Sequence, residues 1–162
     1  MKLTGKVAIV TGGGTGIGRA IAERFVQEGA HVCLVGRRAE KLAEVAFSLP
    51  AEQVATCPGD VTDPAAVEQA IQTALGFGKG IHILVNNAGM DQPPCPAGEL
   101  DVTIWQEVLA VNLTGPFLMI KAVIPHMLAV GGGPLLISLP GLGSWECPVF
   151  RPTVLPRVAL SA

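Results

Sequence analysis

The sequence predicts an α/β fold: a doubly wound parallel sheet that is incomplete at its C-terminal edge, with strand order 3-2-1-4-5. Three observations support this fold class. Short apolar runs alternate with amphipathic helical patterns along most of the 162 residues, a glycine-rich turn follows the first apolar run, and turn residues separate the later ones. Strands that are apolar throughout are typical of a parallel sheet with helices on both faces.

The predicted strands and helices follow one another in regular order. Five apolar runs are expected to be the strands: 7–10, 32–35, 54–57, 81–85 and 135–137. Apolar residues at helical spacing predict the helices: 17–25, 42–49, 67–75, 104–109 and 112–130. Gly29 is suited to end the first helix, and Asp63 to cap the third with Pro64 in its first turn. The segment 91–98 is expected to be an irregular loop.

We expect residues 1–138 to form a single domain and residues 139–162 to form an irregular tail. In the tail, Pro148, Pro152 and Pro156 recur every four residues. Proline lacks a backbone N–H and clashes with the preceding helical turn, so this recurrence prevents a helix there.

Composition limits the partners and the location of the protein. A net charge of −2 argues against binding to nucleic acid or to an acidic membrane surface. The longest apolar stretch, 111–130, contains Lys121, Pro125 and His126, so we expect no membrane span. The cysteines are scattered without the spacing of metal ligands. We therefore expect no metal site, and a cytoplasmic location where thiols stay reduced.

The glycine-rich turn is the first candidate binding site. Backbone N–H groups at a helix N-terminus attract anions, and glycine lets a pyrophosphate approach the backbone. Gly12, Gly16 and Gly18 fit the strand–turn–helix of a Rossmann-type dinucleotide-binding site, although the strict G-x-G-x-x-G spacing is not met. The alternative is that the cluster is only a tight turn. The candidate cofactor-binding residues here are Thr11, Gly12, Gly14, Thr15, Gly16, Ile17 and Gly18.

The end of the second strand bears on the choice of cofactor. An NAD-binding site of this architecture usually has an acidic residue there, which binds the ribose hydroxyls. This chain instead has Gly36 followed by Arg37 and Arg38. A guanidinium group suits a 2′-phosphate, so NADP is favoured, with NAD as the alternative. The alternative is that the two arginines are only a solvated helix start.

Three further motifs, together with the turn, resemble the short-chain dehydrogenase/reductase family. Asp60-Val61 follows the third strand and is similar to the pair that contacts adenine in that family. Asn86-Asn87-Ala88-Gly89 follows the fourth strand and is similar to the motif that lines the cofactor cleft, which makes Asn87, Ala88 and Gly89 candidate cofactor-binding residues. Asn112 resembles the helix asparagine of the proton relay. The motifs span residues 4–138 in the order found in the family.

The resemblance implies a reaction and an assembly. The family transfers hydride between a nicotinamide cofactor and an alcohol or carbonyl carbon, with a tyrosine as general acid/base. A lysine four residues later lowers the pKa of that tyrosine, and a serine about 13 residues earlier orients the substrate. An intact relative is expected to be a homo-oligomer, with the apolar faces of 101–110 and 112–130 at the interface. The alternative is that these faces only cover the sheet.

The chain departs from the family at the catalytic positions. It contains no tyrosine and no lysine after Lys121, and leucine follows Ser138 where the family has its catalytic serine. Asn112 is the one catalytic candidate that is present. We therefore predict that this polypeptide is inactive as written.

A one-base shift in the reading frame near Gly131–Gly133 would account for the departure. Read in the neighbouring frame, the codons from Pro152 to Arg157 permit the string Y-C-A-S-K, and a serine codon is permitted 13 positions earlier, beginning at Leu139. Two alternatives stay open: a non-catalytic dinucleotide-binding fragment and a truncated product without a function.

Overall fold

A computed structural model describes residues 1–91, 95–139 and 143–148 of the chain. The strands are β1 (Val7–Thr11), β2 (His31–Gly36), β3 (Val54–Pro58), β4 (Ile83–Asn86), β5 (Pro134–Leu139) and β6 (Gly143–Pro148). The helices are α1 (Gly16–Gln27), α2 (Ala39–Phe47), α3 (Pro64–Leu75), the 3₁₀ turn η1 (Ala97–Glu99), α4 (Val102–Leu109), the π-helical turn η2 (Ala110–Thr114) and α5 (Gly115–Ala129).

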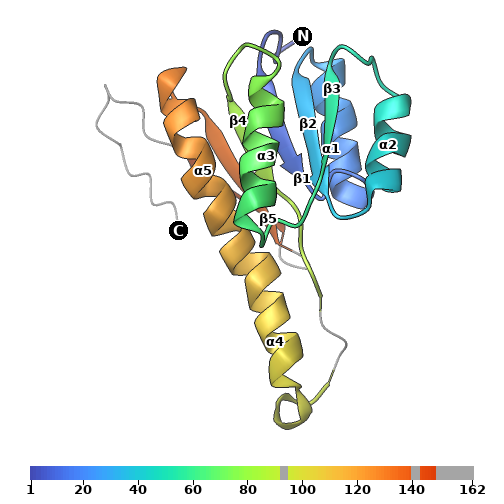
Figure 1. Ribbon diagram of the computed structural model, residues 1–162, viewed down its shortest axis with the longest axis vertical. Helices are drawn as coiled ribbons and strands as arrows, with labels where there is room; N and C mark the ends of the chain where they lie inside the picture. Colours follow the sequence, from blue (N-terminus) through green and yellow to red (C-terminus); the bar gives the residue numbers. More distant parts are fainter. Residues whose placement is uncertain (92–94, 140–142, 149–162) are drawn as a thin grey trace, which may run out of the picture.

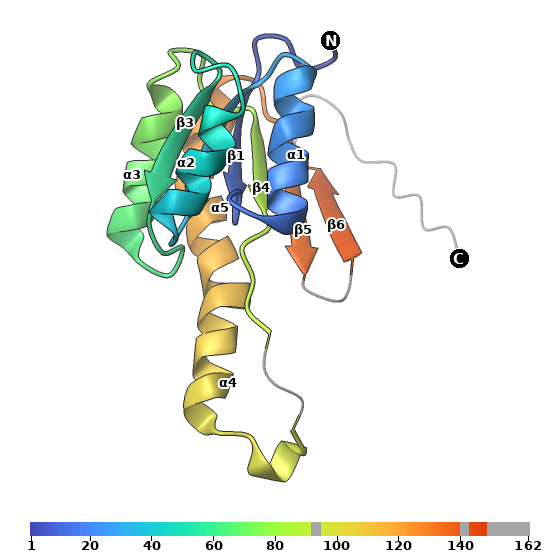
Figure 2. The ribbon, with the colours of Figure 1, turned by 90° about the vertical axis from the view of Figure 1, so that its right-hand side faces the viewer.

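The strands form one sheet in the order β3-β2-β1-β4-β5-β6. The first five are parallel to one another, which confirms the predicted fold class and the predicted order of these strands. Helices α1 and α2 cover one face of the sheet, and α3 and α5 cover the other (Figures 1 and 2). The carboxyl ends of the parallel strands therefore meet at one edge, where α/β proteins of this kind bind their ligands.

Two hydrophobic cores explain why the strands are apolar throughout. In β1, Val7 and Ile9 belong to the core that includes residues of α3 and α5. Ala8 and Val10 belong to the core that includes residues of α1 and α2. All four side chains are fully buried. A strand covered on both faces needs an apolar residue at every position rather than at every second one.

The predicted helix ends are also found. Asp63 caps α3, since its Oδ1 accepts a hydrogen bond of 2.9 Å from the backbone N–H of Ala65, and Pro64 occupies the first helical position. Gly29 follows α1 with φ of +89°, a left-handed conformation that favours glycine. The segment 91–98 includes residues 92–94, which lie outside the described residues.

The prediction of an irregular segment from residue 139 is wrong for 143–148. These residues form β6, which pairs antiparallel with β5 in a register that joins Pro134 to Pro148 and Leu139 to Gly143. The spacing of prolines excluded a helix but not an extended strand, and Pro148 stands at the end of β6, where proline is tolerated. Without β6, β5 would be the edge strand and would offer unpaired backbone groups to any nearby extended segment. Residues 149–162 lie outside the described part of the chain.

The two helices predicted at 104–109 and 112–130 form one continuous rod (Figure 2). The π-helical turn η2 joins them, and such turns are frequent at functional sites. By length and composition alone, the 28 residues Val102–Ala129 would suffice to cross a membrane. However, Met119, Val123 and Met127 of α5 are fully buried in the core, as expected of a helix that covers a sheet.

Helix α4 behaves differently from α5. It has no buried residue and projects beyond the sheet (Figures 1 and 2). One face of the rod carries exposed apolar side chains three or four residues apart, which we call the apolar stripe: Val102, Trp105, Leu109, Leu113 and Phe117. The alternative that these helices only cover the sheet thus holds for the buried face of α5 and does not hold for α4.

Candidate functional site

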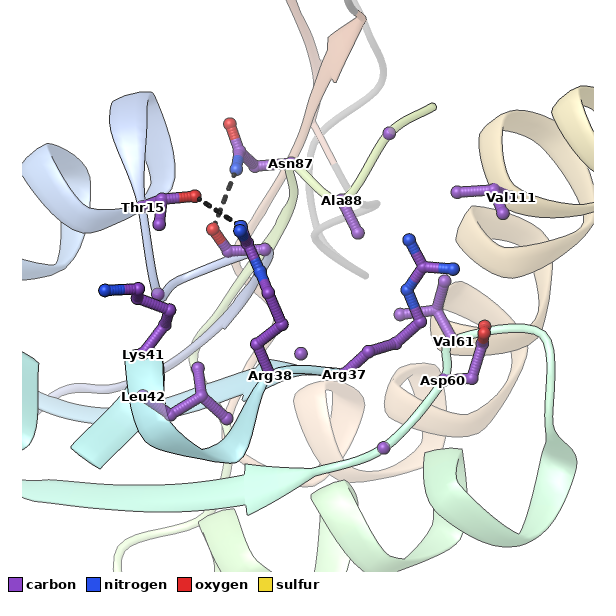
Figure 3. Close-up of a pocket in the computed structure, with 15 residues that line it drawn as sticks. Thr15, Arg37, Arg38, Lys41, Leu42, Asp60, Val61, Asn87, Ala88 and Val111 are labelled. Atoms are coloured by element: carbon purple, nitrogen blue, oxygen red, sulfur yellow. Dashed lines mark hydrogen bonds between the residues drawn. The ribbon is translucent and has the colours of Figure 1, made fainter. Parts of the chain in front are cut away.

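A cleft of about 380 Å³ lies at the carboxyl ends of the parallel strands (Figure 3). Ten of the predicted cofactor-binding residues line it: Gly12, Gly14, Thr15, Arg37, Arg38, Asp60, Val61, Asn87, Ala88 and Gly89. The cleft lining also includes five residues that the sequence analysis did not select: Gly36, Lys41, Leu42, Gly59 and Val111. Four predicted residues do not line it: Thr11, Gly16, Ile17 and Gly18.

The glycine turn owes its shape to the absence of side chains. Gly12 and Gly16 have φ of +65° and +54°, a conformation that other residues rarely adopt. A Cβ atom at Gly18 would collide with the backbone oxygen of Gly12 and lie 2.5 Å from Nδ2 of Asn87. Gly16 and Gly18 therefore shape the turn and the start of α1, whereas the side chain of Ile17 is 66% exposed.

Thr11 and Asn87 fasten the turn to the end of β4. The buried Oγ1 of Thr11 donates to the backbone oxygen of Val85 (3.4 Å) and accepts from the backbone N–H groups of Asn87 and Ala88, each at 2.9 Å. In return, Nδ2 of Asn87 donates to the backbone oxygens of Thr11 (3.2 Å) and Gly12 (3.4 Å). Thr11 thus has a positioning role beneath the cleft, and Asn87 both holds the turn and lines the cleft.

Helix α1 presents its N-terminus to this cleft. Thr15 is the N-cap residue, and no side chain caps the helix there. The first N–H groups of an uncapped helix need hydrogen-bond acceptors, and the helix dipole adds a positive potential. A turn that begins with three glycines (12–14), next to such a helix end, fits the diphosphate of a dinucleotide.

Three cationic side chains line the cleft beside the turn. Nη2 of Arg38 donates to Oγ1 of Thr15 at 3.1 Å. Arg38 and Lys41 lie on the side of Thr15, whereas Arg37 lies on the side of Asp60 and Val61 (Figure 3). The sequence analysis missed Lys41, although its position three residues after Arg38, in the first turn of the following helix, was a usable signal.

Asp60 and Val61 form the opposite wall of the cleft. Oδ1 of Asp60 accepts from the backbone N–H (2.9 Å) and the hydroxyl (2.8 Å) of Thr62, which fixes the loop after β3. Val61 packs against the start of α5, where a Cβ atom at Gly115 would lie only 2.6 Å from its Cγ2. This loop is therefore held rigidly at the side of the cleft.

Asn112, the predicted catalytic residue, lies in the π-helical turn η2 and does not line the cleft; its neighbour Val111 does. Oδ1 of Asn112 accepts from the backbone N–H of Met90, and Nδ2 donates to the backbone oxygen of Met90, both at 2.8 Å. Both ends of the amide thus hold the backbone that follows Gly89. In this structure Asn112 positions the wall of the cleft, and its part in a proton relay stays a prediction.

The match to a family covers this whole arrangement. Residues 6–138 match the family model of the short chain dehydrogenases. The chain belongs to the short-chain dehydrogenase family. This confirms the resemblance carried by the turn, by Asp60-Val61 and by the sequence Asn86–Gly89.

Relatives of known sequence agree with this family. The chain is 38% identical over 144 residues to an uncharacterized oxidoreductase of Staphylococcus aureus (strain MW2), an alignment that covers 89% of the chain and 62% of that protein. It is 42% identical over 140 residues to the D-threitol dehydrogenase of Mycolicibacterium smegmatis, covering 83% of the chain and 52% of that protein. The chain thus spans between half and two thirds of the length of these relatives.

Solved structures give the same result for the fold. A short-chain dehydrogenase/reductase of unknown function from Caenorhabditis elegans, determined with its cofactor, is 34% identical with a TM-score of 0.76 over 82% of this chain and 52% of its own. The 3-ketoacyl-(acyl-carrier-protein) reductase from Brucella melitensis, complexed with NADH, is 35% identical with a TM-score of 0.76 over 80% of this chain and 52% of its own.

Proposed function

We propose that this chain is the dinucleotide-binding part of an oxidoreductase that transfers hydride between NADP(H) and an alcohol or carbonyl substrate. One observation carries the proposal: the three consecutive glycines 12–14 lead to the uncapped N-terminus of α1 inside a cleft with three cationic side chains. A bound nicotinamide cofactor would supply or accept the hydride. The chain's own residues would bind and orient it, with Gly12, Gly14 and Thr15 along the diphosphate and Asp60 and Val61 along the adenine.

The preference for NADP over NAD rests on charge. Gly36 stands where an NAD-binding site of this architecture usually has an acidic residue, and Arg37 and Arg38 follow it directly. A 2′-phosphate beside two guanidinium groups gains charge-assisted hydrogen bonds that a ribose hydroxyl cannot make. NAD stays the alternative, since one structural relative was solved with NADH.

We propose further that the 162-residue polypeptide binds the cofactor without catalysing turnover. The chain contains no tyrosine, so no phenolic hydroxyl is available as the proton donor of the family reaction. Asn112 is held by Met90 and has no such group to serve. A shifted reading frame accounts for this state; the alternatives are a non-catalytic binding fragment and a product without a function. The coding sequence tests the first explanation, which requires a neighbouring frame with tyrosine and lysine codons four positions apart. Tight cofactor binding by the chain as written would favour the binding fragment over a product without a function.

The proposal includes a location and an assembly. We propose a cytoplasmic protein that binds neither nucleic acid nor membranes, because the net charge is −2 and the apolar helix α5 packs on the sheet. The apolar stripe on α4 and α5 supports a homo-oligomer, because contiguous exposed apolar surface marks interaction sites.

Binding and turnover can be measured on the same preparation. Titration calorimetry should show NADPH binding to the full chain, with NADPH preferred over NADH. Replacing both Arg37 and Arg38 by glutamine should remove the preference, about tenfold or more by the strength of charge-assisted hydrogen bonds. Absorbance of NADPH in the presence of alcohols or carbonyl compounds should show no turnover. Absence of binding to either dinucleotide would refute the proposed function, and sustained turnover would refute the proposed inactivity.

A further inference from the structure

We propose that Lys41 is a specificity-determining residue for the 2′-phosphate of the cofactor and that its ion pair with Glu44 limits that specificity. The inference rests on the proposed function, because it concerns the same cleft. It goes further by identifying a third cation and the carboxylate that competes for it.

Lys41 has a fixed place beside the turn. A Cβ atom at Gly14 would lie 3.1 Å from the Cβ of Lys41 and 3.3 Å from its backbone carbonyl carbon, so the turn passes directly over the base of this side chain. Lys41 lines the cleft on the same side as Thr15 and Arg38 (Figure 3). Its ammonium group is therefore tethered within one side chain's length of the turn, on the side where Arg38 already contacts Thr15.

Glu44 forms an ion pair with Lys41. Nζ of Lys41 lies 2.8 Å from Oε1 and 2.9 Å from Oε2 of Glu44, one turn further along α2. Glu44 does not line the cleft. The side chains keep 38% and 55% of their exposure, respectively, so the pair is solvated. An exposed ion pair contributes little free energy, so a phosphate dianion can compete with the carboxylate for the ammonium group.

The charges of Lys41 and Glu44 therefore have opposite effects on the preference for a 2′-phosphate. When a 2′-phosphate is present, Nζ of Lys41 can turn from Glu44 to the phosphate while the stem stays against Gly14. A ribose hydroxyl carries no charge, so it does not compete with the carboxylate of Glu44 for the ammonium group of Lys41. Lys41 thus increases the affinity for a nucleotide with a 2′-phosphate, and Glu44 reduces that increase. Other charged groups near this helix end are Arg37, Arg38 and Glu40, and they are the same in each comparison below.

The test compares two small ligands that differ in the 2′ group: adenosine 2′,5′-bisphosphate and adenosine 5′-monophosphate. The ratio of their dissociation constants, measured by calorimetry on the full chain, isolates the effect of the 2′-phosphate. Lys41→Gln should reduce the preference by about threefold to tenfold, the usual effect of one charge-assisted contact at a partly exposed site. Glu44→Gln should increase it by about twofold to fivefold. In the double variant, Glu44→Gln should have no effect, because the cation that it releases is missing.

Two controls separate this mechanism from a general effect of charge. Glu28→Gln changes the net charge by the same amount as Glu44→Gln but breaks the remote pair with Arg24 on α1. Lys121→Gln removes an exposed lysine of α5 outside the cleft. Neither control should alter the ratio, and the circular dichroism spectrum should show that every variant keeps the fold.

The outcomes distinguish this inference from the proposed function. If the parent chain prefers the bisphosphate and neither Lys41→Gln nor Glu44→Gln alters the ratio, the inference is wrong and the function stands. The inference is also wrong if Glu28→Gln raises the ratio as much as Glu44→Gln. If the parent chain binds neither nucleotide, the proposed function fails, and this inference fails with it.

Discussion

The two halves of the rod formed by α4, η2 and α5 differ in what they contact. Met119, Val123 and Met127 of α5 are fully buried against the sheet, whereas α4 has no buried residue. The cleft is lined mainly by the loops at the carboxyl ends of β1, β2, β3 and β4, and the rod contributes Val111 of η2 to its lining. Binding residues thus belong to the well-packed part of the molecule. Helix α4, on the other side of η2, has apolar surface that no other part of the described chain covers.

This difference is consistent with our proposal that binding and turnover depend on separate parts of the sequence. The cradle for a diphosphate is built from backbone atoms of residues 11–18 and 85–88, which the core of β1 and β4 holds in place. The proposed lack of turnover rests on a different feature, the tyrosine of the family reaction, which this sequence does not contain. A chain can therefore keep the first property without the second.

The largest expected effect is on the free energy of unfolding. It is measured by comparing one variant on the buried face of the rod with one on the exposed face. Met119→Ala removes a fully buried side chain and should cost about 2–5 kcal/mol, because a cavity is added to the lost burial. Leu113→Ala removes a side chain that is 65% exposed and should stay within about 0.5 kcal/mol. Denaturant unfolding monitored by circular dichroism gives both values. Similar costs at the two positions would show that the rod is buried on both faces.

The next effect concerns the cradle. Gly18→Ala places a Cβ atom against the backbone oxygen of Gly12 and should weaken NADPH binding by about tenfold or more, since the turn must open to accommodate it. Gly98→Ala is the matched control, because a Cβ atom there meets open space. Calorimetry with NADPH measures both affinities, and the circular dichroism spectrum checks that the fold is kept. Equal binding by the two variants would contradict a role for this turn.

A smaller effect is expected at the apolar stripe. Trp105→Gln and Leu113→Gln together should lower self-association by about threefold or more, because they remove exposed apolar area without touching the core. Analytical ultracentrifugation over a range of protein concentrations measures this change. Lys121→Gln on the same rod serves as the control and should leave the association unaltered. An unchanged association in the stripe variant would place the interface elsewhere.

The smallest effect is a pH dependence at the opposite end of the sheet from the cleft. Nδ1 of His82 accepts a hydrogen bond of 3.1 Å from the backbone N–H of Val7. Burial, and then the charge of Lys6, lowers the pKa of His82 below its ordinary value of 6.5. The folded chain thus binds this proton less readily than the unfolded chain. The stabilisation is complete above pH 6.5 and is lost as the pH falls from there through the lowered pKa.

His82→Gln should remove this part of the pH dependence, which amounts to less than about 1 kcal/mol because the ring is only partly buried. Unfolding free energies of the parent and the variant, measured at about pH 7.5 and about pH 5.5, provide the comparison. His126→Gln on α5 is the control. A parent chain whose stability rises on acidification over this range would show that the sign is wrong.

Much of the fold could be predicted from the sequence, because its signals are local or periodic. The strands covered on both faces appear as continuous apolar runs, and the cap at Asp63 needs only its own neighbours. Glycine at positions 12 and 16 could be predicted because a strand–turn–helix needs a positive φ there, which glycine adopts most easily. These features do not depend on which distant residue happens to lie nearby.

The remaining features depend on contacts between distant segments. β6 forms because β5 offers an edge, and no periodicity within 143–148 indicates this. Asn112 was expected in a proton relay, but its amide is bound by Met90, 22 residues earlier. Lys41 resembles any solvated lysine of an amphipathic helix unless its contact with Gly14 is known. Such roles arise from tertiary structure, which the pattern of a single sequence does not reveal.

The cradle has a consequence for how this protein tolerates change. At Gly12, Gly16 and Gly18 a hydrogen atom occupies the place where all nineteen other amino acids carry further atoms. Leucine can be exchanged for methionine in a core at small cost, but these positions have no near equivalent. Every missense mutation in their codons is therefore a radical one, however similar the new residue looks by size or polarity.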